Sequence, residues 1–397
     1  MKKQAIFFSP FMAYCFTFMA AMLVYLLDWS YLYPRLSWQL VCFFAGTFLI
    51  SFITACFFKS FNLFVYNEQT NKIPSLSIFF LLAGYFLDCA WSRTVPFISL
   101  ATGASTYEDV QLDFGIPTFH VVLVGYNAFI SVFYFHTYLS QKRKRTLFLF
   151  IISLVLPLLI MSRITITLAF IGCFYIYLFS IRKHLMAKLL KLSAIGLLFL
   201  FGFGLLGNIR TAADVSADDV FLAIGDARDS FRESWVPKSF FWGYIYASSP
   251  IANLQLTINH ESKSANSQAG LKNFLIHELV WDAVSKKYDN ATAGGRIGFT
   301  QINDAFNVGS IFARPYAYIG FTGMALMYIF IWGISILYIL QLDRNSKYYV
   351  TYLCFFNALI ILCVFDNMLT FTPFALVLLF PLFDKVYSLL NKRKNAL

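Results

Sequence analysis

The sequence predicts an all-α polytopic membrane protein with about 10 transmembrane helices and one large loop. Three observations lead to this fold class. The chain has 397 residues, of which 59% are hydrophobic and only 13% are charged, and its mean hydropathy is +0.66. Apolar runs of about 20 residues recur, and each is long enough to cross a hydrocarbon core of about 30 Å. The runs are continuously apolar, so they predict helices, which satisfy their own backbone hydrogen bonds in lipid.

The first apolar run follows the N-terminal Met1-Lys2-Lys3 and continues to Leu27. No small-x-small cleavage pattern closes it, so we interpret it as a transmembrane helix and not as a signal peptide. The later runs are interpreted in the same way. The predicted spans cover approximately residues 5–27, 37–58, 75–92, 115–139, 146–161, 163–181, 189–207, 316–341, 348–367 and 369–390.

The distribution of positive charge predicts the orientation of these spans. More than half of the 31 Lys and Arg residues lie near turns that share one side of the membrane, and the short loops on the other side hold only Arg35, Arg93 and Arg163. By the positive-inside rule the first side is cytoplasmic, and both termini lie there. The net charge of +11 is therefore a topology signal. Because the cations are scattered over separate turns, they do not predict a nucleic-acid partner.

This topology divides the chain into three parts. Residues 1–207 form an N-terminal bundle of about seven helices, residues 208–314 form a large extracytoplasmic loop, and residues 315–397 form about three further helices. The loop holds more than half of the 20 acidic residues and about a third of the basic ones. In so apolar a chain, we expect the chemistry or the recognition to lie in this loop.

Two segments of the loop have a recognisable pattern. Residues 239–259 are uncharged and rich in aromatic residues, but a crossing there would invert every later loop, and Ser248-Ser249-Pro250 interrupts the run. We therefore expect an interfacial or re-entrant segment. Residues 272–286 fit one amphipathic helix, with His277 and Glu278 on or near its polar face.

Several kinds of site are not indicated by the sequence. It contains no Walker A, CxxC, HExxH or GxSxG pattern, and all seven cysteines lie in apolar segments. We therefore predict no cofactor and no metal. His120 lies in an apolar run, where we expect a structural partner inside the bundle. Asp88 and Asp366 lie at or near span ends, where an acid is either functional or interfacial.

Arginines are the more informative residues. Arg163, Arg210 and Arg314 each lie where an apolar span meets the outer membrane boundary, and Arg232 and Arg296 lie within the loop. Two interpretations stay open. The side chains either snorkel to lipid headgroups or form structural ion pairs, or they form a guanidinium cluster that holds phosphate groups through bidentate hydrogen bonds.

Short local patterns spread over most of the chain resemble a known family. They are Gly115-Ile116-Pro117, Met161-Ser162-Arg163, Gly207-Asn208-Ile209-Arg210, Tyr246-Ala247-Ser248-Ser249-Pro250-Ile251-Ala252-Asn253-Leu254 and Tyr318-Ile319-Gly320-Phe321-Thr322-Gly323. In these patterns and in its layout the chain resembles the Wzy family, the O-antigen or oligosaccharide repeat-unit polymerases of bacterial inner membranes.

The resemblance implies a GT-C-like fold and a glycosyltransferase at the periplasmic face of the bacterial inner membrane. Such enzymes transfer a growing glycan from undecaprenyl pyrophosphate onto a fresh lipid-linked unit, without nucleotide sugar or ATP. A flippase and a chain-length regulator are the implied partners, together with membrane lipid. In this chemistry the arginines would stabilise the departing pyrophosphate. His277, Glu278 or Asp304 would serve as the base for the acceptor hydroxyl.

Two other functions compete with polymerisation. An O-antigen ligase has nearly the same layout, with one large periplasmic loop that carries arginines and a histidine. A polysaccharide flippase or other secondary transporter is the non-enzymatic alternative. Transporters usually show internal repeats, broken helices and short loops, whereas this chain has no visible repeat and a loop of about a hundred residues.

Overall fold

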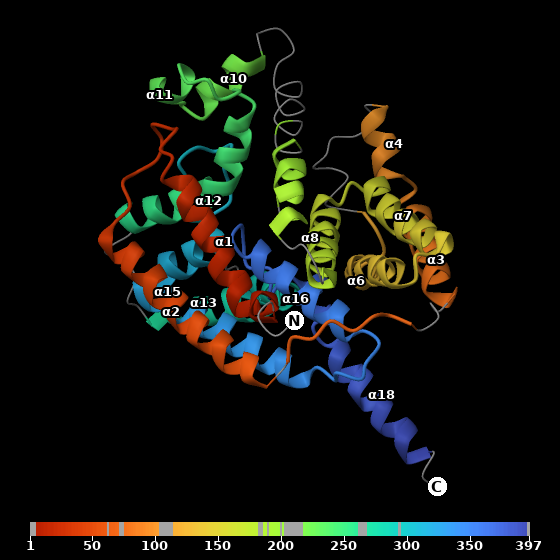
Figure 1. The fold of residues 1–397 in the computed structure, drawn as a ribbon. Helices are drawn as coiled ribbons and strands as arrows, with labels where there is room; N and C mark the ends of the chain where they lie inside the picture. Colours follow the sequence, from red (N-terminus) through yellow and green to blue (C-terminus); the bar gives the residue numbers. More distant parts are fainter. Residues whose placement is uncertain are drawn as a thin grey trace.

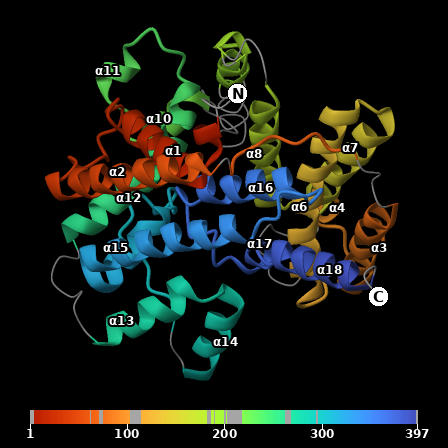
Figure 2. The same ribbon diagram turned by 60° about the horizontal axis from the view of Figure 1, so that its bottom comes forward.

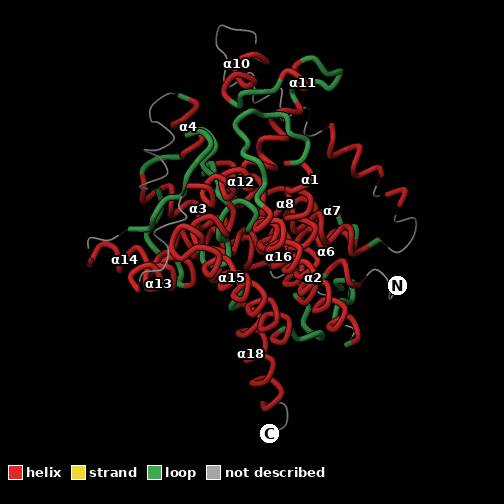
Figure 3. The backbone as a smooth tube through the Cα atoms, turned by 90° about the vertical axis from the view of Figure 1, so that its left-hand side faces the viewer, coloured by secondary structure: helices red, strands yellow, loops and turns green. Residues whose placement is uncertain are grey.

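The computed structural model describes residues 5–61, 63–70, 75–102, 114–181, 186–188, 190–198, 201, 217–260, 268–292 and 295–394. Within these ranges the regular elements are helical, apart from one isolated bridge between Ser30 and Ala227. Figure 3 shows the helices and the loops that join them. The all-α prediction is therefore confirmed.

The elements follow one another along the chain as short and long helices. They are η1 (Ala5–Phe8), α1 (Pro10–Tyr25), α2 (Trp38–Ser60), α3 (Ser75–Ser92), α4 (Pro96–Ala101), α6 (Phe119–Gln141), α7 (Lys144–Leu159), α8 (Arg163–Ser180), α10 (Ala217–Ile224), α11 (Asp229–Arg232), α12 (Phe240–His260), α13 (Gln268–Phe274), η2 (Leu275–Leu279), α14 (Asp282–Thr292), α15 (Ser310–Gln341), α16 (Tyr349–Leu362), α17 (Thr372–Val377) and α18 (Phe380–Lys394).

Within the described residues, α2, α6, α8 and α15 are long and apolar enough to cross a membrane, and α1, α3 and α16 are shorter apolar helices. This composition makes the chain a helical membrane protein, while the count of ten spans stays a prediction. The predicted span 189–207 lies partly outside the described residues. The predicted span 369–390 is not one helix, because α17 ends at Val377 and α18 begins at Phe380.

Helix α16 forms the centre of the molecule (Figures 1 and 2). It packs against α8 and α6 on one side and against α1 on the other. All but one of its 14 residues are buried, as expected for a helix that is apolar on every face. Its buried Asn357 donates a hydrogen bond from Nδ2 to the carbonyl oxygen of Phe8 at 2.8 Å, which ties the centre to the N-terminus.

The segment predicted to be interrupted at Pro250 is instead one continuous helix, α12, which packs against α1 and α15. Four polar residues in its second half and middle, Ser248, Asn253, Gln255 and Thr257, are buried and have protein partners. The hydroxyl groups of Ser248 and Tyr33 are 2.9 Å apart, and Gln255 Oε1 accepts a hydrogen bond from the backbone N–H of Ser37 at 2.7 Å. Proline removes one backbone donor, but packing and side-chain hydrogen bonds on several sides hold the helix together across Pro250.

Helix α15 begins at Ser310, six residues before the predicted span, and contains a sharp corner. Ile319 and Gly320 have non-helical backbone angles, and Gly320 has a φ of 64°. A Cβ atom on Gly323 would lie 2.0 Å from the carbonyl oxygen of Pro315, so the chain folds back too tightly for any side chain there. The two glycines of this sequence pattern therefore make the corner possible.

The prediction that His120 has a partner inside the bundle is confirmed. Its Nδ1 lies 2.7 Å from Asp88 Oδ2, and Asp88 is fully buried. The other carboxylate oxygen of Asp88 accepts a hydrogen bond from the backbone N–H of Ile116 at 2.9 Å. Asp88 therefore joins the end of α3 to the start of α6, and both of its oxygens are used there.

Candidate functional site

The chain from residue 268 to residue 292 does not form the single amphipathic helix that the sequence predicts. It is divided into α13, a π-helical turn η2 and α14. The polar residues His277 and Glu278 are buried, with 4% and 1% exposure, whereas Leu271 and Leu275 are exposed. The prediction that His277 and Glu278 lie on an exposed polar face is therefore wrong, because both side chains face charged partners within the protein.

The partner of Glu278 is Arg296. Arg296 Nε donates to Glu278 Oε1 and Arg296 Nη2 donates to Glu278 Oε2, both at 3.0 Å, in the bidentate geometry of a guanidinium–carboxylate pair. Arg296 Nη2 also lies 3.5 Å from Asp366 Oδ1. Arg314 Nη1 donates to the same oxygen of Asp366 at 2.7 Å. We call these four residues the arginine–carboxylate cluster.

Four segments meet in the arginine–carboxylate cluster: η2, the chain between α14 and α15 that carries Arg296, the first turns of α15, and the chain just after α16. The backbone N–H of Asn367 donates to Asp366 Oδ1 at 2.7 Å, and Asn367 Nδ2 donates to the carbonyl oxygen of Glu278 at 2.7 Å. The guanidinium of Arg314 lies over the ring of Phe299, 5.2 Å from its centroid. These contacts fix both arginines at the place where the large loop returns to the helical bundle.

The cluster combines a buried carboxylate with partly exposed cations. Side-chain exposure is 1% for Glu278, 34% for Arg296, 19% for Arg314 and 36% for Asp366. Burial raises the pKa of the Glu278 carboxyl, and the guanidinium groups of Arg296 and Arg314 oppose that shift. Burial would lower the pKa of Arg296, but the carboxylates of Glu278 and Asp366 outweigh it and raise that pKa. Arg296 is therefore a permanent cation that an external ligand can approach.

His277 lies beside the cluster with an incomplete set of hydrogen bonds. Its Nε2 is 3.4 Å from Asp289 Oδ1, and its ring is parallel to that of Tyr318 with centroids 6.1 Å apart. Its Nδ1 is buried and has no hydrogen-bond partner in the described part of the chain. The Tyr318 hydroxyl in turn accepts a hydrogen bond from the backbone N–H of Ile297 at 3.1 Å. A histidine held next to a carboxylate, with one nitrogen unused, has the arrangement expected of a general base.

Asp304, the third predicted base, has a different environment. It is exposed on the segment between Arg296 and α15, and within the described residues it makes no hydrogen bond or ion pair. The segment itself is anchored by Asn253, which donates from Nδ2 to the carbonyl oxygens of Phe306 and Val308 and accepts from the N–H of Ile302.

Of the remaining predicted arginines, Arg232 has partners outside the cluster. Arg232 donates from Nε to the carbonyl oxygen of Ala227 at 2.8 Å and from Nη2 to that of Leu222 at 3.1 Å, so its guanidinium closes the end of α10. Helix α11, which carries Arg232, lies far from α13 in Figures 1 and 2. Arg163 is exposed at the first position of α8, and Arg210 lies outside the described residues.

The loop between α1 and α2 pairs with the chain around α11. Arg228 Nη2 lies 3.1 Å from Asp28 Oδ1, and its guanidinium lies 4.7 Å from the centroid of the Tyr31 ring. Most of the aromatic residues near α12 are also packed within the protein, where Phe241 and Tyr244 are buried, whereas Trp235 is 93% exposed. Trp235 is thus the described aromatic residue of this region that is most open to solvent.

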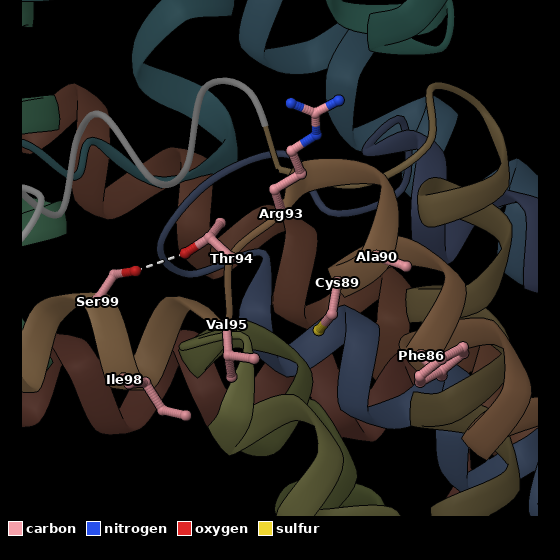
Figure 4. A pocket seen from close by; sticks show the side chains of 8 residues that line it. All are labelled: Phe86, Cys89, Ala90, Arg93, Thr94, Val95, Ile98 and Ser99. Atoms are coloured by element: carbon pink, nitrogen blue, oxygen red, sulfur yellow. Dashed lines mark hydrogen bonds between the residues drawn. The ribbon is translucent and has the colours of Figure 1, made fainter.

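An open groove of about 500 Å³ lies at the corner between α3 and α4 (Figure 4). Phe86, Val95 and Ile98 give it an apolar lining, and the guanidinium of Arg93 extends away from its floor. None of the predicted site residues lines this groove. It therefore offers a surface for an apolar molecule, and the groups suited to acid–base chemistry lie elsewhere.

Within the described residues, no group of three or more His, Cys, Asp or Glu side chains has an arrangement that could hold a metal ion. Comparisons of the chain with protein-family models, with curated proteins and with solved structures gave no match. The arginine–carboxylate cluster, with His277 and Asp289 beside it, is thus selected by its geometry alone. Four of these six residues were predicted site residues: His277, Glu278, Arg296 and Arg314. The sequence also indicated Asp366 as an acid near a span end, but it did not indicate Asp289.

Proposed function

We propose that the protein is a glycosyltransferase of the Wzy type, which joins undecaprenyl-pyrophosphate-linked oligosaccharide units at the periplasmic face of a bacterial inner membrane. The observation that carries the proposal is the convergence of Arg296 and Arg314 on one oxygen of Asp366, 3.5 and 2.7 Å away. Two partly exposed guanidinium groups side by side match the two phosphates of a lipid-linked diphosphate. Their place at the junction of loop and bundle suits a substrate anchored in lipid.

The proposed reaction uses the cluster to stabilise the leaving group. A hydroxyl of the acceptor sugar attacks the anomeric carbon of the donor, and the bond from that carbon to the diphosphate oxygen breaks. The diphosphate leaves with the electron pair, and its growing negative charge is stabilised by Arg296 and Arg314. The proton of the acceptor hydroxyl moves to a base. Of the three candidates, His277 has the most suitable geometry, because its Nδ1 is unused and Asp289 faces its Nε2.

Other parts of the proposal come from the resemblance of the sequence to the Wzy family. The donor and the acceptor would both be carrier-linked oligosaccharides, delivered by a flippase, and a chain-length regulator would limit the product. A GT-C-like arrangement of about ten spans belongs to the same proposal. Trp235, 93% exposed, is a candidate for stacking on a sugar ring.

Deletion of the protein in its native host, followed by gel analysis of the surface glycan, tests this function. We expect single repeat units on the surface acceptor and no long polymers. Full-length polymer that accumulates on the lipid carrier would instead indicate a ligase. Units that accumulate on the cytoplasmic leaflet would indicate a flippase.

Substitution of the arginines tests the role of the cluster. Lysine keeps the charge but lacks the planar fork, so we expect Arg296→Lys and Arg314→Lys to lower chain extension by about 10²–10³-fold at a normal protein level. Arg93→Lys, at an exposed arginine outside the cluster, is the matched control and should extend chains like the wild type. Normal ladders in both cluster variants would refute the proposed role.

A further inference from the structure

Glu278 occupies the edge of Arg296 that a phosphate would use. A guanidinium binds two oxygens of a phosphate or of a carboxylate with the same pair of parallel N–H groups. In this structure the Nε and Nη2 groups of Arg296 both donate to Glu278, at 3.0 Å each. The internal carboxylate therefore stands where one phosphate of a diphosphate ligand would bind.

The arginine–carboxylate cluster has no net charge when its members are ionised. The positive charges of Arg296 and Arg314 are balanced by Glu278 and Asp366. A diphosphate that approached the intact cluster would meet two carboxylates as well as two cations. Its binding becomes favourable only when at least one carboxylate leaves its arginine, because like charges at such distances repel each other.

The structure around Glu278 has features that lower the free-energy cost of separating its carboxylate from Arg296. Glu278 lies in a π-helical turn between α13 and α14, and π-turns are often found at functional sites. Two buried atoms next to it, His277 Nδ1 and Asn367 Oδ1, have no hydrogen-bond partner in the described structure. Unsatisfied buried polar atoms destabilise the arrangement that contains them. A movement of η2 that gave these atoms partners would offset part of the loss of the ion pair.

We propose that Glu278 is an internal counter-ion that closes the phosphate-binding edge of Arg296 until a diphosphate displaces it. This inference rests on the proposed function, because it takes the cluster to be a diphosphate site. It makes Glu278 a residue that controls access to Arg296 and not the base of the reaction. It also means that the empty site rejects weak anions, because each ligand has to replace two charge-assisted hydrogen bonds.

The experiment measures binding of inorganic pyrophosphate to the full-length purified protein in lipid nanodiscs by calorimetry. Glu278→Gln removes the competing charge, so we expect pyrophosphate to bind about tenfold to a hundredfold more tightly than to the wild type. Glu233→Gln is the matched control, because Glu233 is exposed in the same loop and the substitution changes the net charge equally. It should leave the affinity within about twofold of the wild-type value.

Two further variants keep the test decisive. Glu278→Asp retains the charge but shortens the side chain, so we expect an affinity between those of the wild type and Glu278→Gln. The double variant Arg296→Lys/Glu278→Gln should not show this increase in pyrophosphate affinity, because the increase depends on the guanidinium of Arg296. Thermal unfolding of each variant establishes that it is folded.

The inference is overturned if folded Glu278→Gln binds pyrophosphate no more tightly than the wild type, or if Glu233→Gln gains as much. The proposed function is tested separately, since the glycan ladder does not depend on the binding assay. If the wild type and Glu278→Gln bound pyrophosphate equally and deletion still removed the ladders, the proposal of polymerisation would be supported and the counter-ion role of Glu278 would be refuted.

Discussion

The side-chain amide of Asn253 is the attachment point between the helical bundle and the segment that leads to Arg314. It is completely buried in α12 and makes three hydrogen bonds to that segment. Nδ2 donates to the carbonyl oxygens of Phe306 at 2.6 Å and Val308 at 2.8 Å, and Oδ1 accepts from the N–H of Ile302 at 2.8 Å. Asn253→Leu keeps the branched outline of the asparagine side chain but removes all three bonds.

The expected loss of stability follows from those three contacts. A buried polar group left without a partner costs about 1–3 kcal/mol. The bond to Phe306 is fully buried, whereas the bonds to Val308 and Ile302 are partly buried, so water can reach the groups that lose them. We therefore expect the Asn253→Leu substitution to destabilise the protein by about 2–5 kcal/mol, toward the lower end of the sum of three unsatisfied groups.

Thermal unfolding in detergent measures this effect, with Asn259→Leu as the matched control. Asn259 lies on the same helix, is exposed, and accepts one hydrogen bond from Gln255 Nε2 at 2.9 Å. The control should change stability by less than about 1 kcal/mol, as surface substitutions usually do. If Asn253→Leu and Asn259→Leu unfolded at the same temperature, the amide would not be the attachment point.

Three other outcomes are expected. Gly323→Ala should destabilise the protein or prevent its accumulation, because the new Cβ would lie 2.0 Å from the carbonyl oxygen of Pro315; normal accumulation and melting would contradict the tight corner. Trp235→Cys should react with a membrane-impermeant thiol reagent in spheroplasts while Lys385→Cys stays protected, and the reverse labelling would overturn the predicted orientation. His277→Gln should lower chain extension by about 10²–10⁴-fold, as loss of a general base does, and near-normal ladders would exclude it as the base.

The sequence by itself determined the class of the fold. Apolar runs of bilayer length leave few alternatives to helices, because backbone groups in lipid need internal partners. The individual boundaries agree well where a run is uninterrupted, as for α2, α6 and α8, whose ends lie within a few residues of the predicted ones. The predicted interruption at Pro250 and the single helix predicted over 369–390 were wrong, because proline and local packing have effects that composition does not reveal.

The sequence also indicated which residue types would matter, but not which of them meet. The sequence does not show which of Arg232, Arg296 and Arg314 lie close to one another. In the fold Arg232 closes the end of a helix, whereas Arg296 and Arg314 share Asp366, which lies 52 residues beyond Arg314. An ion pair between residues so far apart depends on how the helices pack, and no local pattern records that packing.

Tertiary structure alone decided the orientation of the segment that carries His277 and Glu278. Helical periodicity predicts that its leucines are buried and its acid is exposed, because apolar burial is the usual stabilising contribution. In the structure Glu278 has a bidentate partner inside the protein, and the π-turn η2 shifts the register that the periodicity assumed. A charged side chain can be buried when it is paired with a counter-ion, and the counter-ion of Glu278, the partly exposed Arg296, is placed by the tertiary fold.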